Sequence, residues 1–294
     1  MNNVQARGFG TAYDIAIVAA CNNEGILNAN LKRSPVVAEG HIPLHVEWNA
    51  PSAAIAYNRA LAATDAQIII FAHQDVFLPR GWETVLFARI AELERKHPDW
   101  ALLGSYGVAE NGGRFGPVWS SSLGSIVGRV PMEPVKVQSF DEHLFVMRRD
   151  AGLQFDEGLP GFHLYGTDIV QIARNAGRGS YAMALPLIHN DGFKEQLGDD
   201  YLEGYRFMQK KWRDRLPLLT PVSKVTWHGL NLRRSRWRAL SSRRVRIDNA
   251  VPNVCDPRIY ASLCGWTDLT QSAEDANTAG GHAEQHACCG CQGA

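Results

Sequence analysis

The sequence predicts an α/β fold in which helices cover both faces of a mainly parallel sheet. Short apolar runs alternate with helical patterns through the first half of the chain, which is the arrangement that builds such sheets. Polar clusters follow several of the apolar runs directly. The chain has 294 residues and is 45% hydrophobic, so it has ample material for a packed core.

Each expected strand is a short apolar or extended run that ends at turn-forming or polar residues. The clearest is Gln67–Ala72 (QIIIFA), whose unbroken apolar character indicates a strand buried on both faces. The full set of expected strands is Asp14–Ala20, Pro43–Trp48, Gln67–Ala72, Leu102–Val108, Val135–Arg149 and Tyr181–Ile188.

The expected helices are recognised by apolar residues that return on one face. The stretch Gly81–His97 shows this spacing and stops before Pro98. Another helix is expected to open at Asp168 and to end at Gly177. Two more are expected over Ser52–Ala63 and Asp199–Trp212.

Polar clusters lie at the ends of three of the expected strands, at Cys21–Glu24, Glu47–Asn49 and His73–Asp75. In open parallel sheets, ligands bind beyond the carboxyl ends of the strands. We therefore expect these clusters to meet along one edge of the sheet and to form a binding site there.

Composition and charge exclude some classes of function. The formal net charge is zero, so no overall field attracts nucleic acid, and none is expected as a partner. No apolar run is long enough to span a membrane, and the first residues lack the apolar core of a secretory signal, so a cytoplasmic location is expected. The six cysteines are placed too unevenly for a disulfide framework.

Changes in composition along the chain predict three segments: a main domain over 1–220, a basic extension over 221–269 and a disordered tail over 270–294. Within the extension, Arg233–Arg246 is rich in arginine and contains no acid. One interpretation is a peripheral contact with anionic lipid headgroups, or with a phosphate-bearing acceptor, at the inner membrane face. The other is an ordinary solvated helix. Trp237 favours an interfacial role.

A collinear series of short motifs runs from Asp14 to Gly192. Its first half consists of the loop CNNEG after the first strand, then Tyr57-Asn58-Arg59, then His73-Gln74-Asp75-Val76. Its second half consists of Val146-Met147-Arg148-Arg149, Phe155-Asp156-Glu157, Gly166-Thr167-Asp168-Ile169 and His189. The series resembles family 2-type glycosyltransferases with the GT-A fold, and it is most similar to a glycosyltransferase-like group related to a streptomycin-biosynthesis protein domain.

The resemblance implies transfer of a sugar from a nucleoside-diphosphate sugar to a glycan, lipid-linked or small-molecule acceptor, with inversion at the anomeric carbon. Extension of a cell-surface polysaccharide would be one such reaction. It also implies Mn²⁺ or Mg²⁺ on the diphosphate, with Asp75 as first ligand and His189 as second. Imidazole suits Mn²⁺ better than Mg²⁺. Asp168 is the expected general base.

Six further residues are expected near the donor. Asn22, Glu24 and Glu47 are candidates for nucleobase or ribose contacts, and a plain turn is the alternative for the first two. Asn58 either contacts the donor or caps a neighbouring loop. His73 is a third ligand or a hydrogen-bond donor to phosphate, and Gln74 lies beside it in the same motif. In two places the chain departs from the family pattern, because His73 and Thr167 replace acids.

Two other functions remain open. A non-catalytic module that binds nucleotide sugars or glycans would retain the fold without turnover, and the histidine at position 73 favours it. A sugar nucleotidyltransferase would need a glycine-rich phosphate loop with a lysine after the first strand, and the segment CNNEGILNANLKR has no such motif.

Overall fold

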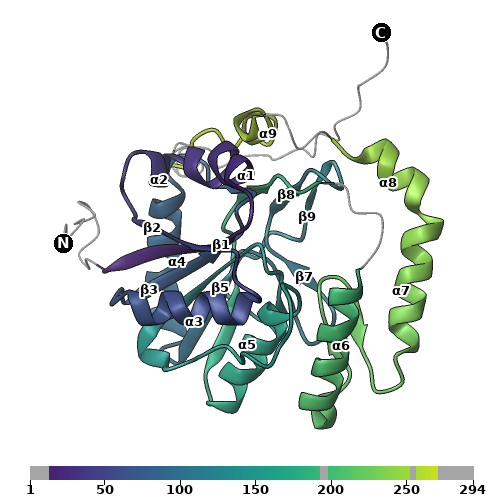
Figure 1. Ribbon diagram of the computed structural model, residues 1–294. Coiled ribbons are helices and arrows are strands. Elements are labelled where there is room, and N and C mark those ends of the chain that lie inside the picture. Colours follow the sequence, from purple (N-terminus) through teal and green to yellow (C-terminus); the bar gives the residue numbers. More distant parts are fainter. Residues whose placement is uncertain (1–12, 193–197, 252–255, 271–294) are drawn as a thin grey trace.

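The computed structural model describes residues 13–192, 198–251 and 256–270, without the side chains of residues 236, 239 and 246. Its centre is a seven-stranded sheet with the strand order β10-β13-β5-β12-β3-β1-β2 (Figure 1). The strands of this sheet are β1 (Ile15–Cys21), β2 (Leu44–Trp48), β3 (Ile68–Ala72), β5 (Trp100–Gly104), β10 (Val135–Lys136), β12 (Leu144–Arg148) and β13 (Gly179–Ala182).

Five of these strands point the same way. β1 pairs in parallel with both β2 and β3, and β13 pairs in parallel with β5. β12 lies between β3 and β5 and is antiparallel to both, and β10 is antiparallel to β13 at the edge. The expected mainly parallel sheet flanked by helices is therefore confirmed.

Helices cover both faces of the sheet. One face packs against α3 (Ala53–Ala63), α5 (Tyr165–Asn175) and α6 (Asp199–Lys211). The other packs against α1 (Glu24–Ala29), α2 (Pro35–Ala38) and α4 (Trp82–Lys96), together with the short 3₁₀ turn Leu31–Arg33. Two further 3₁₀ turns span Arg149–Ala151 and Arg213–Arg215.

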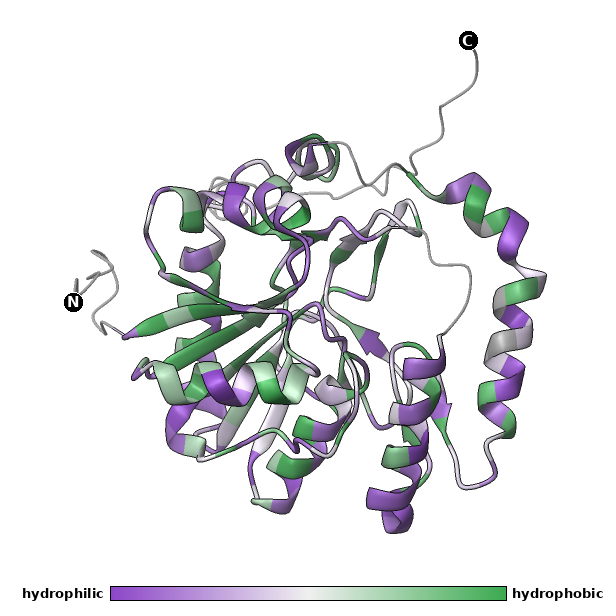
Figure 2. Cartoon of the chain, in the orientation of Figure 1, coloured by the Kyte–Doolittle hydropathy of each residue, from purple (hydrophilic) through white to green (hydrophobic). Residues whose placement is uncertain are grey.

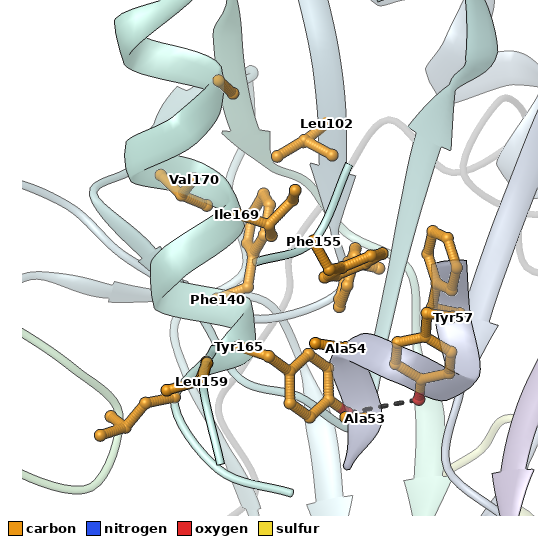
Figure 3. Close-up of a cluster of buried hydrophobic side chains, with 14 of the residues drawn as sticks. Ala53, Ala54, Tyr57, Leu102, Phe140, Phe155, Leu159, Tyr165, Ile169 and Val170 are labelled. Atoms are coloured by element: carbon orange, nitrogen blue, oxygen red, sulfur yellow. Dashed lines mark hydrogen bonds between the residues drawn. The ribbon is translucent and has the colours of Figure 1, made fainter. Parts of the chain in front are cut away.

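β3 shows why an unbroken apolar run forms the middle of the sheet. Alternate side chains of a strand point to opposite faces. Ile69 and Phe71 enter the core under α3 and α5, whereas Ile68 and Ile70 enter the core under α4. In the first core, Phe71, Phe155, Tyr57 and Tyr165 form an aromatic cluster, part of which is seen in Figure 3.

Smaller sheets lie beside the central one. One has the order β4-β14-β8-β9, and another has the order β11-β6-β7. A two-stranded sheet joins β15 to β16. Their strands are β4 (Val76–Phe77), β6 (Gly107–Val108), β7 (Arg114–Phe115), β8 (Val118–Ser120), β9 (Ser125–Val127), β11 (Ser139–Phe140), β14 (Leu187–His189), β15 (Leu218–Leu219) and β16 (Lys224–Val225).

Three expected strands were each too long. Leu102–Val108 divides into β5 and β6, Val135–Arg149 divides into β10, β11 and β12, and Tyr181–Ile188 divides into β13 and β14. Consecutive parts belong to different sheets, although β10 and β12 both lie in the central one. An apolar pattern reports extended, buried backbone, but it does not report which sheet a strand joins.

The helix expected to open at Asp168 begins earlier, at Tyr165, so Asp168 lies inside its first turn. The residue before the helix is Leu164, which has a φ of 67° and provides no side-chain cap. Because the usual polar start signal is missing there, the sequence pattern placed the start at the next suitable residue.

The expected boundary at residue 220 falls between β15 and β16, which pair with each other. After β16 come α7 (Leu230–Ser241), α8 (Arg243–Asn249) and α9 (Pro257–Leu263). α9 returns to the main body, where Tyr260 stacks on Trp119 of β8. Apart from Thr270, the expected tail over 270–294 lies outside the described residues. Among the helices that the structure describes, none has the length and apolar character needed to cross a membrane.

Candidate metal and nucleotide site

The polar ends of β1 and β3 meet as expected, because the two strands are parallel neighbours. The side chain of Gln74 joins them. Its Oε1 accepts hydrogen bonds from the backbone N–H of Asn22 at 3.2 Å and of Asn23 at 3.1 Å. Its Nε2 donates to Asn22 Oδ1 at 2.8 Å. Gln74 therefore holds the loop after β1 against the turn after β3.

Glu24 and Glu47 lie along the same edge. Glu24 is the first residue of α1, and Asn23 caps that helix by accepting the N–H of Ile26 at 3.1 Å. Glu47 is in β2, and its carboxylate contacts His45 Nε2 at 2.8 Å. Glu24 directly follows the loop that Gln74 fixes, and Glu47 pairs with Ala20 of β1. Their proposed nucleoside contacts remain predictions.

Asn58 caps a neighbouring loop, which is the second of the two roles expected for it. Its Nδ2 donates to the carbonyl oxygen of Phe155 at 2.9 Å, and its Oδ1 accepts the N–H of Phe155 at 2.9 Å. Nδ2 also donates to Glu157 Oε1 at 3.0 Å. Both ends of the amide are thus used to hold the 155–157 loop on α3. A direct donor contact of Asn58 stays a prediction.

His73, Asp75 and His189 form a cluster in which one potential ligand atom of each lies within 4.8 Å of the others. Asp75 Oδ1 is 3.4 Å from His189 Nε2 and 3.8 Å from His73 Nδ1. The register of β4 and β14 brings His189 there, because His189 pairs with Val76 and the N–H of Asn190 donates to the carbonyl oxygen of Asp75 at 2.8 Å.

The hydrogen-bond partners of His73 determine which of its ring nitrogens carries the proton. The hydroxyl of Tyr165 donates to the carbonyl oxygen of Glu142 at 3.0 Å and lies 2.9 Å from His73 Nε2. A hydroxyl has one proton to donate, so His73 Nε2–H is the donor in the second bond. The lone pair of the neutral ring is then on Nδ1, which faces Asp75 and suits metal binding.

The two histidines of the cluster differ in protonation. Burial lowers the pKa of His73 to about 4, so its ring is neutral at pH 7. Burial also acts to lower the pKa of His189, but the carboxylates of Asp75 and Asp191 outweigh it and raise the pKa to about 9. Without a cation, the positive charge of His189 therefore balances Asp75.

Sequence reasoning missed a second set of residues beside this cluster, at Asp141, Glu142 and His143. The N–H of His73 donates to the carbonyl oxygen of His143 at 2.9 Å, so the segment lies directly alongside β3. Asp141 Oδ1 is 2.7 Å from His143 Nδ1, and His143 Nε2 is 2.9 Å from Ser105 Oγ. The signal was present as three consecutive ionisable residues in an otherwise apolar stretch, SFDEHLFVM.

The pKa values of the two carboxyl groups in this segment are shifted in opposite directions. Burial acts to raise the pKa of Asp141, but His143, His189 and His73 together hold it well below its usual range. Burial and the charge of Asp141 raise the pKa of Glu142 to about 8. A pair of carboxyl groups with separated pKa values is a recurrent feature of active sites.

Asp168 lies elsewhere, at the contact between α5 and α6. It is 2% exposed, and its two oxygens accept hydrogen bonds from Lys211 Nζ at 2.8 Å and Trp212 Nε1 at 2.7 Å. Burial raises the pKa of Asp168, and the Lys211 ammonium opposes that shift. These contacts join the two helices. The role of Asp168 as general base stays a prediction.

The donor set of the cluster fits a divalent cation. Two imidazoles and one carboxylate leave room for oxygens from a phosphate group or from water, and the nitrogen ligands favour Mn²⁺ over Mg²⁺. The cluster lies at the carboxyl end of β3, beside the loop that follows β1, which is the usual ligand position in such sheets.

No protein-family model matches the chain. A curated protein of Fuscovulum blasticum, described as "ATP synthase subunits region ORF 6", is 29% identical over 172 residues, which cover 55% of this chain and 66% of that protein. Its description states no activity.

Several solved structures are similar to part of this chain. GalNAc-T7 with UDP, GalNAc and Mn²⁺ has a TM-score of 0.47 and 13% identity, covering 69% of this chain and 48% of its own. The mannosyltransferase PcManGT from Pyrobaculum calidifontis, with GDP-Man and Mn²⁺, has a TM-score of 0.41 and 13% identity, covering 94% and 84%. S. aureus TarS residues 1–349 have a TM-score of 0.41 and 12% identity, covering 67% and 65%. The chain thus spans about half the length of the first of these.

Proposed function

We propose that this protein is a nucleotide-sugar-dependent glycosyltransferase with a GT-A-like fold, and that His73, Asp75 and His189 hold the divalent cation of its donor. The observation that carries the proposal is the position of this N,N,O cluster. It lies at the carboxyl edge of the sheet, next to a loop that the Gln74 side chain holds in place. A cation there would neutralise the diphosphate leaving group.

The protein's own residues would supply binding and orientation. Gln74 fixes Asn22 and Asn23, so the loop that would meet a nucleoside is held in place. Glu24 and Glu47 would accept hydrogen bonds from a ribose or a nucleobase. Asn58 acts indirectly, since it holds the 155–157 loop. Precise placement of this kind accounts for a large part of the rate in group-transfer enzymes.

Inverting transfer also needs a group that accepts the proton of the attacking hydroxyl. Asp168 is the residue that the family pattern indicates, but in this conformation both of its oxygens bind α6. Glu142 is a second candidate. It is one residue from His143, whose carbonyl oxygen binds the N–H of His73, and it has a pKa of about 8. Asp168→Asn and Glu142→Gln variants would separate the two candidates by their rates of donor hydrolysis.

The acceptor and the location belong to the same proposal. A glycan, a lipid-linked sugar or a small-molecule hydroxyl would each suit the chemistry, and extension of a cell-surface polysaccharide from the cytoplasmic side is the reaction we favour. The proposal includes no nucleic-acid partner, because the charges of the chain sum to zero.

The test is a thermal-shift panel of nucleoside diphosphates and nucleotide sugars, each with Mn²⁺, Mg²⁺ or EDTA. Ligands that bind only the folded protein raise its melting temperature by mass action. We expect a shift with one nucleoside that is larger with Mn²⁺ than with Mg²⁺, absent in EDTA and lost in Asp75→Ala. Asp150→Ala, an exposed carboxylate paired with Arg148, is the control and should retain the shift. No shift with any member of the panel would overturn the proposal.

A binding module without turnover is the second candidate, and the histidine at the first position of the metal motif favours it. The same panel distinguishes a binding module from the enzyme when donor hydrolysis is measured in parallel. A metal-dependent shift without release of nucleoside diphosphate, with or without an acceptor, would support the binding module.

A further inference from the structure

Large apolar side chains are exposed along α7 and in the turn before it. Trp227 is 79% exposed and Trp237 is 68% exposed, although tryptophan is normally among the more buried residues. Leu230 and Leu240 are more than half exposed as well. In Figure 2, apolar and polar segments alternate along α7, which lies at the outside of the molecule.

The opposite side of α7 attaches to the protein. Leu232 is buried in the main core. Gln209 of α6 donates from its Nε2 to the carbonyl oxygen of Trp227 at 3.3 Å, just before the helix. The helix is therefore held in place, and the side that carries Trp237 faces away from the core. Positions 230, 237 and 240 share one face of a helix with 3.6 residues per turn.

Positive charge surrounds the exposed apolar stripe formed by Trp227, Leu230, Trp237 and Leu240. Among the side chains that the structure describes there, the exposed arginines of α7 and α8 are Arg233, Arg234, Arg238, Arg243 and Arg244. From Leu230 to Asn249 the sequence contains one acidic residue, Asp248. Val245 and Ile247 of α8 are also exposed and extend the apolar surface beyond α7.

A groove runs beside the stripe, between α7 and the strands β7, β15 and β16. It has a volume of about 290 Å³, and Arg114, Lys224, Arg234 and Arg238 line it together with polar groups such as Ser223. Its described lining residues include four cations and no carboxylate. Such a groove suits a phosphate group.

We infer that α7 and α8 dock on an anionic lipid bilayer, with Trp227, Leu230, Trp237 and Leu240 at the level of the headgroups and the adjacent groove around a lipid phosphate. Tryptophan and leucine between arginines are typical of helices that lie in the membrane interface. The arginines add attraction to anionic lipid, which falls as salt rises.

Charge and composition favour the membrane over other occupants. A second copy of this chain would place two arginine-rich surfaces against each other, and like charges repel. Exposed leucine, valine and isoleucine gain nothing from a nucleic-acid backbone, whereas they gain from burial in acyl chains. The inference does not depend on the proposed transfer reaction.

The experiment is vesicle co-sedimentation of the full-length protein with liposomes of phosphatidylcholine alone, or of phosphatidylcholine with 30 mol% phosphatidylglycerol. We expect at least ten-fold tighter binding to the anionic vesicles, weakening between 0.05 and 0.5 M NaCl on the order of ten-fold because surface charges are screened. Trp237→Ser should weaken binding about ten-fold, and Arg233→Glu/Arg234→Glu should abolish it.

Two matched controls keep the test specific. Leu263→Ser removes an exposed leucine of α9, and Arg95→Glu reverses an exposed charge on α4; both should bind vesicles like the original protein. All the substituted positions are exposed, and circular dichroism confirms that each variant is folded. Absence of vesicle binding, equal binding to both lipids, or unchanged binding by the α7 variants would overturn the inference. A dimer in sedimentation velocity that is lost in Trp237→Ser would assign the surface to a second copy instead.

Discussion

His73 and Tyr165 are joined by a hydrogen bond of 2.9 Å between His73 Nε2 and the Tyr165 hydroxyl, which connects the end of β3 to the first residue of α5. The same hydroxyl donates to the carbonyl oxygen of Glu142 at 3.0 Å. It also lies 3.4 Å from the hydroxyl of Tyr57, and a dashed line marks this contact in Figure 3. Tyr165 thus orients a candidate metal ligand from within the aromatic core.

The first prediction follows from that bond. Tyr165→Phe removes the hydroxyl that selects the His73 tautomer, and outer partners of metal ligands typically account for about ten-fold or more in affinity. We expect Mn²⁺ to bind about ten-fold more weakly by calorimetry. Tyr201→Phe is the control, because it removes a buried hydroxyl whose partner is Ser223 rather than a residue of the metal cluster. Equal Mn²⁺ affinities in the two variants would show that Tyr165 does not act on the site.

The second prediction concerns Asp168. Asp168→Ala leaves Trp212 Nε1 without its acceptor and removes one of the two carboxylates around Lys211. Breaking a buried pair of this kind costs about 3 kcal/mol of the free energy of unfolding. Asp156→Ala removes the other carboxylate, which is more exposed, and should cost less than about 1 kcal/mol. Urea denaturation measures both values, and equal losses would contradict the structural role of Asp168.

The third prediction concerns Gly116, which has a φ of 115°. A Cβ there would lie 1.7 Å from the carbonyl oxygen of Ser105, so the backbone would have to move. Gly116→Ala should destabilise the protein by about 3 kcal/mol or more. Gly152 also has a positive φ, but a Cβ there meets nothing within 4 Å, so Gly152→Ala should cost about 1 kcal/mol. Thermal unfolding of the two variants separates the loss of stability caused by the steric clash from the loss caused by the backbone conformation alone.

The fourth prediction is a pH dependence of thiol chemistry. Burial raises the pKa of Cys264 to about 11. Since only the thiolate reacts, and a raised pKa keeps the thiol protonated, alkylation of Cys264 should be slow at pH 8. Its rate should rise about ten-fold for each pH unit up to about 11. Peptide mapping by mass spectrometry after iodoacetamide treatment follows this cysteine separately from the others. A rate independent of pH between 8 and 10 would contradict the shift.

Local sequence patterns were sufficient to predict most of the helices and strands. The apolar run at Ile68–Ala72 forms β3, Ser52 caps α3, and the apolar spacing before Pro98 forms α4. Each of these signals lies within a few residues, so a sequence can carry it. The meeting of Asn22 with Gln74 was also predictable, because parallel neighbours end at the same edge of a sheet.

The site was predictable only in part. Asp75 and His189 lie together as expected, with His73 as the third member of the cluster. Tyr165, Asp141 and Glu142 were missed, because their importance depends on contacts with residues far away in the chain. Asp168 reads as a helix-opening acid in the sequence, and only the packing of α6 shows that Lys211 and Trp212 occupy its oxygens.

The sequence by itself determined the class of fold and the residues that close its strands, since hydrophobic periodicity and turn chemistry act over short distances. Only the tertiary structure decided how the long extended stretches divide among sheets, which nitrogen of His73 faces Asp75, and which side of α7 remains exposed. The reason is physical: strand pairing, hydrogen-bond direction and burial are properties of pairs of residues that are close in space, and a local pattern does not contain the second member of the pair.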